Sequence, residues 1–429
     1  MLAFLFAVFG IFLILLGAPI VTSILVSIAS TGIATQFELF KFYDITQWII
    51  KNSFNYGTFA IALFIISGNL MTKGKITEKI FNIFTYYLGK KNGFMPIIGI
   101  LTCLFYGAIS GSGPATVAAV AAMIFPMLID FGYEKNFSAA LLMCAGSLGM
   151  VIPPSLPLMF YGMMTEQDMS SLFKVSLVIG LTIGFLLIIY AYIYSKKHPI
   201  DQDKVDSMVD ELRKNKFSDL LKDSIWALLM PFVILGGIFT NVLSTTEAAT
   251  ISVIYTLIVS IYIYKSLDYK TALETIRESL PIAAGLSIML SVAYSFSNAI
   301  AALNGPQIIG EYVTSTFKSP TLLFIAILTA FFIMGMFMDG GATLGILTPI
   351  LFPIIMSIGI NPIIFGCDII LVIALGLCTP PFGLSLFVVS PMAESSVADI
   401  TKEAIPLIII MLITVFVFAI FPNLALWII

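Results

Sequence analysis

Apolar runs of nearly membrane-spanning length recur along the whole chain, separated by short polar segments. A spanning helix needs about 20 mostly apolar residues, and runs that are continuous rather than alternating favour helices over a barrel. We therefore predict an all-α integral membrane protein embedded in a lipid bilayer. The runs predict spans near 1–17, 19–35, 53–71 and 170–195, and again near 225–241, 246–264, 282–300 and 404–428.

Each half of the chain also contains an arm, a re-entrant helical hairpin and a broken helix. The first half has a lysine-rich amphipathic arm at 73–91, a hairpin at 93–131 with its tip at 110–116, and a broken helix at 137–164. The second half has an arm at 301–318, a hairpin at 320–357 with its tip at 339–343, and a broken helix at 362–390. Each half is thus expected to cross the membrane about five times.

The chain repeats itself, without a gap, after 227 residues. With this shift Gly113 falls on Gly340, and Pro153-Pro154 falls on Pro380-Pro381. The matched residues are mostly Gly, Pro and Thr, which break or cap helices. Two copies of a Gly/Pro-interrupted segment in a hydrophobic protein are typical of a secondary transporter, with its binding site where the broken elements meet at mid-membrane.

An odd number of crossings in the first half means that the second half is inverted. The two inverted repeats would occupy 1–195 and 225–429, joined by a strongly polar linker at 196–224. If the linker is cytoplasmic, as the positive-inside rule favours, both termini are periplasmic. Of the 21 Lys and Arg residues, the only ones then left outside are Lys41, Lys51, Lys174 and Lys318.

Composition supports the membrane assignment and argues against several function classes. The chain is 59% hydrophobic and only 10% charged, with a mean hydropathy of +1.05, whereas soluble proteins carry about 25% charged residues. The first apolar run lacks a charged leader and a cleavage site, so we expect a retained helix. No P-loop, nucleophile elbow or HExxH motif occurs and no basic patch stands out. We therefore expect no catalytic residues, no ATP-driven motor and no nucleic-acid binding.

The first hairpin tip is rich in small and hydroxylated residues that suit a Na⁺ site. Irregular backbone at membrane depth is tolerated only where it lines a cavity or is buried in protein. Hydroxyl groups and freed carbonyl groups at the tip and at the first helix break would be the ligands. A kinked helix pair with packing glycines is the structural alternative. The candidate metal ligands are Ser110, Ser112, Thr116, Gly149 and Ile152.

The second tip and break repeat this pattern, with a carboxylate added. Asp339 could ligate Na⁺, cap the following helix or carry a proton, because intramembrane carboxylates are costly and usually functional. Its counterpart in the first copy is Ser112, so the two ion sites need not be equivalent. The candidate ligands are Asp339, Gly340, Thr343, Gly376 and Thr379.

The predicted membrane core contains no arginine to hold an anionic substrate. A carboxylate would have to be bound by hydroxyl groups, amides and helix N-termini. The candidate substrate-binding residues are Ser147, Ser155, Asn298, Gly113 and Gly340. Asp368 lies within the second broken helix, where two alternatives are open: it faces a water-filled crevice, or it lies closer to the helix end than the bounds 362–390 imply.

These motifs make the chain resemble the large membrane subunit of tripartite ATP-independent periplasmic (TRAP) transporters, in the ion transporter superfamily. The resemblance covers essentially the whole length. Gly340-Gly341 departs from the hydroxylated residues expected after Asp339, and Asp368 is not associated with the family. The most specific pieces are Ser110–Thr116, Ile152–Ser155, Gly236–Phe239, Thr246–Ala249, Gly335–Asp339, Leu347–Ile350 and Gly376–Leu384.

The resemblance implies an elevator-type, Na⁺-coupled importer in the bacterial inner membrane, with two or more Na⁺ ions bound. The hairpins and broken helices would form a transport domain that moves against a static scaffold domain. A small TRAP membrane subunit, expected as a separate chain, would brace the scaffold. A periplasmic substrate-binding protein would deliver a small carboxylate; sialic acid, C4-dicarboxylates and other sugar acids all remain open.

Other interpretations of the sequence remain. The runner-up is a stand-alone Na⁺- or H⁺-coupled carboxylate transporter that needs no binding protein. A channel is disfavoured because paired hairpins close a site, whereas a channel needs a continuous path. A membrane enzyme is remote because the chain lacks a clustered set of His, Asp and Glu residues.

Overall fold

The computed structural model describes residues 9, 13 and 18–429, except for 39, 54–55, 92, 199, 215–216 and 305–318. Across these residues the chain is helical and contains no strand. Eight of the described helices are long and apolar enough to cross a membrane. The predicted all-α membrane fold is thereby confirmed. The span expected at 1–17, apart from two residues, and most of the arm at 301–318 lie outside the described residues.

The helices of the first copy follow the predicted order of spans, arm, hairpin and broken helix. They are α2 (Ile20–Ala34), α3 (Phe42–Ser53), α4 (Tyr56–Lys73), α5 (Ile76–Leu88), α6 (Met95–Ser110), α7 (Gly113–Asp130), α8 (Lys135–Ser147), the short η1 (Leu148–Met150), α9 (Leu156–Thr165) and α10 (Met169–Lys197). The arm α5 turns away from α4 by 63°. Helices α6 and α7 form the hairpin, and α8, η1 and α9 form the broken helix.

The second copy follows the same plan after the linker helix α11 (Gln202–Arg213). Its helices are α12 (Phe217–Phe239), α13 (Thr245–Ile258) with the short η2 (Val259–Ile263), α14 (Tyr269–Ala302), α16 (Pro320–Phe337), α17 (Gly340–Ser357), α18 (Pro362–Leu377), α19 (Leu384–Ala393), α20 (Val397–Ile420) and α21 (Asn423–Leu426). Helices α16 and α17 form the second hairpin, and α18 and α19 form the second broken helix.

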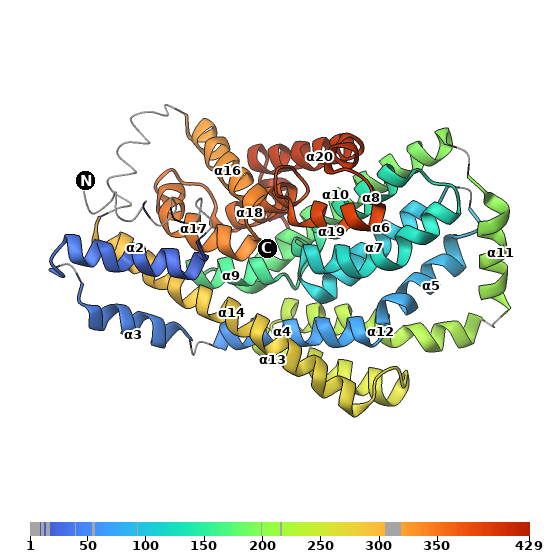
Figure 1. Cartoon of the computed structure of the whole chain (residues 1–429), viewed down its shortest axis with the longest axis horizontal. Coiled ribbons are helices and arrows are strands. Elements are labelled where there is room, and N and C mark those ends of the chain that lie inside the picture. Colours follow the sequence, from blue (N-terminus) through green and yellow to red (C-terminus); the bar gives the residue numbers. More distant parts are fainter. Residues whose placement is uncertain are drawn as a thin grey trace.

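The 227-residue shift seen in the sequence is reproduced by the helix boundaries. It carries Gly113–Asp130 of α7 onto Gly340–Ser357, which are the bounds of α17. Both breaks contain a cis peptide bond, at Pro153-Pro154 and at Pro380-Pro381. The repeat is therefore structural, and the two hairpins enter from opposite ends of the molecule and approach each other at its centre (Figure 1).

The helices form two layers (Figure 1). One layer contains α2, α3, α4, α12, α13 and the long α14, which packs against α2, α3 and α4. The other contains the two hairpins and the two broken helices, with α10 and α20 packed among them. The outer spans were expected to form the scaffold. Most of them lie in the first layer, whereas α10 and α20 lie in the second layer, with the elements expected to carry the site.

Two elements of the first layer differ from the sequence expectation. Helix α3 has no counterpart among the predicted elements, because residues 36–52 lack an apolar run of spanning length. The span expected at 282–300 begins earlier, at Tyr269, and is a single helix of 34 residues. Asp268 starts it by accepting a hydrogen bond from the backbone N–H of Thr271, and Ala272 and Thr275 of the polar first part are buried. Burial against neighbouring helices thus extends the helix through a segment whose composition suggested a loop.

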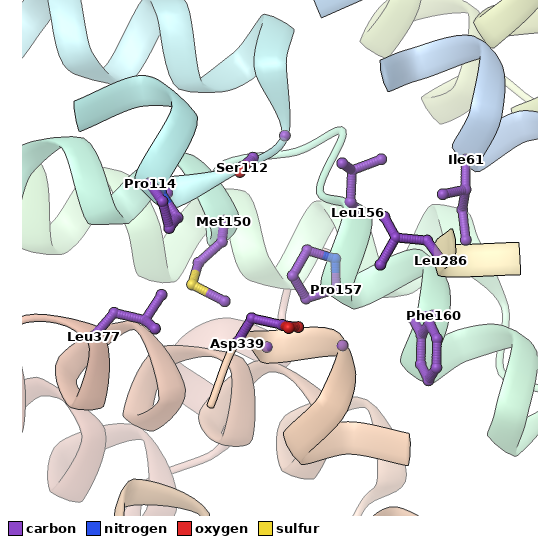
Figure 2. Close-up of a pocket in the computed structure, with 14 residues that line it drawn as sticks. Ile61, Ser112, Pro114, Met150, Leu156, Pro157, Phe160, Leu286, Asp339 and Leu377 are labelled. Carbon is purple, nitrogen blue, oxygen red and sulfur yellow. The ribbon is translucent and has the colours of Figure 1, made fainter. Parts of the chain in front are cut away.

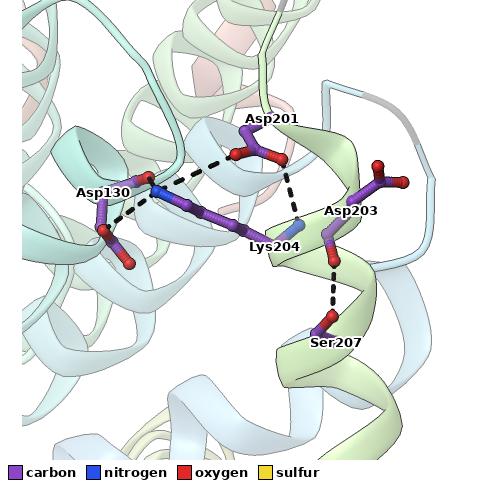
Figure 3. A network of polar contacts seen from close by, with 5 residues as sticks. All are labelled: Asp130, Asp201, Asp203, Lys204 and Ser207. Carbon is purple, nitrogen blue, oxygen red and sulfur yellow. Dashed lines mark hydrogen bonds and ion pairs between the residues drawn. The ribbon is translucent and has the colours of Figure 1, made fainter.

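The polar linker also contains a helix that the sequence pattern did not predict. Helix α11 packs against the arm α5 and buries Val205 and Val209. At its start Lys204 Nζ donates to the carbonyl oxygen of Asp130, at 3.1 Å, and lies 3.4 Å from the Asp130 carboxylate (Figure 3). The backbone N–H of Asp201 donates to Phe131 O at 2.9 Å. The linker is therefore tied both to the arm and to the base of the first hairpin.

Candidate functional site

The tip of the first hairpin is held against the first helix break. Gly111 has a positive φ of 63°, and a Cβ at this position would lie 2.5 Å from Pro154 O. The N–H of Leu156 donates to Gly111 O at 3.1 Å. Only glycine combines this backbone conformation with such a close approach, so Gly111 fixes the tip to the break.

Oxygen atoms of this tip converge on one point beside Gly149. Ser110 Oγ and Thr116 Oγ1 are 2.7 Å apart, and Thr116 Oγ1 donates to Ser112 O at 2.8 Å. A Cβ on Gly149 would lie 2.3 Å from Thr116 Oγ1 and 3.1 Å from Ser112 O. The structure thus brings four of the predicted ligand residues together, namely Ser110, Ser112, Thr116 and Gly149. Their close approach is possible because residue 149 has no side chain.

The fifth predicted residue of this set, Ile152, was proposed for its backbone oxygen, and its side chain has a packing role. Ile152 is buried, and its N–H donates to Leu148 O at 2.8 Å. Its side chain packs onto Gly180 of α10, where a Cβ would come within 2.5 Å of Ile152 Cδ1. Ile152 therefore packs the break against α10 in this structure.

At the second tip, Asp339 is the N-terminal cap of α17. Its carboxylate accepts a hydrogen bond from Ala342 N at 3.0 Å, and its carbonyl oxygen accepts one from Thr343 Oγ1 at 3.0 Å. The side chain is only half-buried. Capping is thus observed directly, and it uses only part of the acceptor capacity of the carboxylate.

The second helix break is packed differently from the first. A Cβ on Gly376 would lie 2.6 Å from the carbonyl carbon of Gly335, so this glycine lets the break contact the backbone of α16. Thr379, which follows the end of α18, donates from Oγ1 to Leu375 O in the last turn of that helix, at 2.7 Å. This hydroxyl supports the end of α18 through its hydrogen, and its oxygen keeps acceptor capacity.

A cavity of about 190 Å³ lies between the two tips (Figure 2). Both hairpins reach it, through Ser112 and Gly113 of the first and Asp339 and Gly340 of the second. The carboxylate of Asp339 points along the cavity towards Leu286 (Figure 2). The rest of the lining consists of Ile61, Gly111, Pro114, Met150, Leu156, Pro157, Phe160, Leu286, Gly341 and Leu377.

Three helices present their N-terminal ends to this cavity. They are α7, which begins directly after Ser112, α17, capped by Asp339, and α9, whose first residues Leu156 and Pro157 line the wall. The N-terminal end of a helix carries a partial positive charge and free N–H groups. No Lys, Arg or His is found among the described lining residues. The cavity can therefore attract an anion only through backbone dipoles and through bound cations.

The predicted substrate residues divide into two groups. Gly113 and Gly340 line the cavity. Ser147 and Ser155 do not: Ser147 Oγ donates to Ser385 Oγ at 2.8 Å, and the Ser155 hydroxyl accepts from Leu158 N while donating to the Met150 carbonyl. Asn298 lies on the exposed face of α14. These hydroxyls cap and link helices, and the amide of Asn298 is not brought to the cavity.

The apolar wall of the cavity was not predicted from the sequence. Met150 and Leu377 are related by the 227-residue shift and lie on opposite copies of the break, one residue after Gly149 and Gly376. The repeat could have identified this pair. Leu286 and Phe160 have no such signal, because only packing of α14 and α9 brings them to the cavity.

Comparison with known proteins decides the family. The family model for the tripartite ATP-independent periplasmic transporter, DctM component, matches residues 6–424. The chain belongs to this family. It is the large permease component of a TRAP transporter, and the resemblance drawn from the motifs is confirmed.

Relatives of this TRAP permease are named for different solutes. It is 32% identical to the isethionate permease DctMQ of Oleidesulfovibrio alaskensis over 408 residues, which cover 95% of this chain and 63% of that protein. It is 30% identical to the C4-dicarboxylate permease DctM of Pseudomonas aeruginosa, with 88% of this chain and 87% of the relative covered. The sialic acid permease SiaT of Haemophilus influenzae is 27% identical over 91% of this chain and 65% of its own length. The TRAP permease thus spans less than two thirds of two of these relatives.

Two solved transporters share the fold. Neisseria gonorrhoeae MtrF superimposes with a TM-score of 0.59 at 14% identity, covering 88% of this chain and 84% of MtrF. Alcanivorax borkumensis YdaH gives a TM-score of 0.55 at 11% identity, covering 87% of each chain. At this level of identity the likeness shows the architecture alone.

Proposed function

We propose that this TRAP permease imports a small carboxylate in symport with Na⁺, by an elevator movement of the hairpin layer against the α2–α4 and α12–α14 layer. The observation that carries the proposal is the convergence of both duplicated tips on one cavity. A periplasmic binding protein would deliver the solute, and a small membrane subunit would brace the scaffold, as the family membership supports. The charge distribution supports an inner-membrane protein with both termini in the periplasm.

The residues of the first tip fit a Na⁺ ion. Ser110 Oγ, Thr116 Oγ1 and Ser112 O are hard oxygen donors that lie within hydrogen-bond distance of one another, and Gly149 lies against Thr116 and Ser112. Na⁺, when bound, supplies the positive charge that the lining side chains lack. The second tip offers the remaining acceptor capacity of Asp339, so the proposal includes two sites of unequal composition.

The chain's own residues then account for coupling. Each tip would close over the cavity at the point where a half-helix begins. A Na⁺ ion bound at a tip and an anion bound in the cavity would then both favour the closed arrangement of Ser112 and Asp339. Linkage requires that Na⁺ raise the affinity for the acid by the same factor as the acid raises the affinity for Na⁺. The hairpins and broken helices would move as one body, because they pack on each other across the two copies.

The deciding experiment is uptake into proteoliposomes that contain this chain and its small subunit. Purified binding protein loaded with labelled organic acid is added, with or without an inward Na⁺ gradient. Uptake that requires both the binding protein and the gradient is the expected result. Uptake of free acid without the binding protein would support the runner-up, a stand-alone carboxylate transporter. Conductance in liposomes that is not coupled to the solute would support a channel.

A further inference from the structure

The cavity between the tips is small. Its volume is about 190 Å³. A cavity of about 150 Å³ in another protein holds one benzene molecule, whereas sites for drug-sized ligands measure roughly 300–1,000 Å³. A second cavity, of about 180 Å³, shares Ser112, Leu156 and Leu286 with the first, and neither Asp339 nor any other described residue of the second hairpin lines it. A solute held between both tips is therefore confined to the first cavity and must be compact.

The wall of this cavity is apolar. Met150, Leu156, Phe160, Leu286 and Leu377 supply most of its side-chain surface. Ser112 and Asp339 are the only polar side chains among the described residues that line it. A second carboxylate, or the hydroxyl-rich body of a sugar acid, would lose its water here without gaining hydrogen bonds. Burying polar groups in this way is costly.

The tips provide for one anionic group. In the first turn of α17, Ala342 N and Thr343 N are bonded to Asp339, which leaves the N–H groups of Gly340 and Gly341 at the cavity. The first residue of α7, Gly113, also lies there. Backbone N–H groups at helix N-termini bind a carboxylate without any cationic side chain.

We propose that the solute taken by this site is a compact monocarboxylate with an apolar body, and neither a dicarboxylate nor a nine-carbon sugar acid. The carboxylate lies at the N-termini of α7 and α17, and the apolar body contacts Met150, Phe160 and Leu286. This inference rests on the proposed function, because it assigns the substrate class of the same site.

The test measures binding to the purified full chain in nanodiscs, as thermal stabilisation at matched Na⁺ concentrations. The probes are 3-methylbutanoate, 2-hydroxy-3-methylbutanoate, succinate and N-acetylneuraminate. We expect Na⁺-dependent binding of the two monocarboxylates to be at least about tenfold tighter than that of succinate, with no binding of N-acetylneuraminate, because the second carboxylate would be buried unpaired. Succinate or N-acetylneuraminate binding equally well, and with Na⁺ dependence, would overturn the substrate class and leave the proposed function standing. Binding of none of the probes at any Na⁺ concentration would overturn the substrate class, whereas loss of Na⁺ dependence alone would count against the coupling.

A variant pair tests whether this cavity sets the preference. Leu286→Arg adds a cation to the apolar wall, so the ratio of succinate to 3-methylbutanoate affinity should rise at least about tenfold. Leu273→Arg is the matched control, because Leu273 lies on the same helix and is half exposed. An unchanged ratio in a folded Leu286→Arg protein would place the determinant elsewhere and overturn the assignment.

Discussion

The glycines at the two helix breaks correspond in the repeat and differ in what they contact. Gly149 lies against Thr116 and Ser112, whereas Gly376 lies against the backbone of Gly335. The 227-residue repeat predicts that both positions need a residue without a side chain. It does not predict that Gly149 contacts a cluster of oxygen atoms while Gly376 contacts the backbone of another helix, because these contacts depend on the neighbouring hairpin.

We expect Gly149→Ala to weaken Na⁺ dependence. The new Cβ would enter the oxygen cluster at 2.3 Å from Thr116 Oγ1, so the apparent Na⁺ affinity should fall about 10–100-fold, as for lost support of a metal ligand. The measurement is a Na⁺ titration of uptake. Gly236→Ala is the control, because nothing lies within 4 Å of a Cβ at that position. Equal Na⁺ affinity in the two variants would remove Gly149 from the ion site.

Asp339 can be tested so that its capping and ion-binding roles separate. Asn caps helices about as well as Asp, so Asp339→Asn should retain thermal stability while its Na⁺ affinity falls about tenfold or more. Asp339→Ala should lose the hydrogen bond to Ala342 N and about 1 kcal/mol of stability in addition. Thermal unfolding and Na⁺ titration are measured on both variants. An unchanged Na⁺ affinity in Asp339→Asn would show that Asp339 caps α17 and does not bind Na⁺.

The sequence identifies the residues of the tips better than the wall of the site. Gly113 and Gly340 could be found because small residues that recur at a duplicated hairpin tip indicate a tight turn at membrane depth, and Ser112 directly precedes Gly113 in the first tip. Ser147 was a reasonable guess from its hydroxyl, yet this hydroxyl is used by Ser385. A side-chain type indicates what a residue can donate, whereas its direction comes from packing, which a single sequence does not contain.

At the scale of elements, the polar linker contains a helix that the pattern of apolar residues does not predict. Helix α11 has charged residues on most faces, and its buried contact is limited to Val205 and Val209, four residues apart. That spacing places both on one face of a helix. The end of the arm receives this face at Gly89, where a Cβ would lie 2.6 Å from Val209 Cγ2. The apolar pair, rather than the surrounding charges, is expected to hold the linker in place.

This expectation can be measured by hydrogen exchange of residues 202–213. Val209→Asp would bury an unpaired charge, so α11 should detach and its amides should exchange at least about tenfold faster. Lys204→Ala removes ion pairs that are half exposed. Such pairs contribute at most about 1 kcal/mol, so exchange should change less than about fivefold. The opposite order of effects would show that the ion pairs hold the linker.

The long α14 and the pair α3 and α4 occupy corresponding places in the two copies. A shift of 227 carries Phe42–Ser53 onto the first part of α14, yet the first copy has two helices and the second has one. The repeat predicts which segments correspond, but not that two helices of one copy match a single helix of the other. Asn69 of α4 donates to Ser279 of α14 at 2.9 Å, so the two copies are joined directly within this layer.

At the scale of the whole molecule, the order of spans, hairpins and breaks followed from apolar runs and the repeat. The division into two layers did not, because it depends on which faces of α4, α13 and α14 pack together. The layers meet closely where Gly68 of α4 faces the first tip. A Cβ on Gly68 would lie 3.4 Å from Ser110 Cα. An elevator movement requires this contact to slide.

We therefore expect Gly68→Leu to block transport and spare binding. A leucine side chain at this point would extend into the hairpin backbone and obstruct movement of one layer past the other, so uptake should fall about tenfold or more, as for a gating step. Binding of the acid at saturating Na⁺ should stay within about threefold, because Gly68 contacts Ser110 of the first ion site but does not line the cavity between the tips. Gly236→Leu is the matched control, since the same side chain there meets open space. Undiminished uptake in Gly68→Leu would mean that α4 and the first tip do not move against each other, and the elevator proposal would lose its sliding surface.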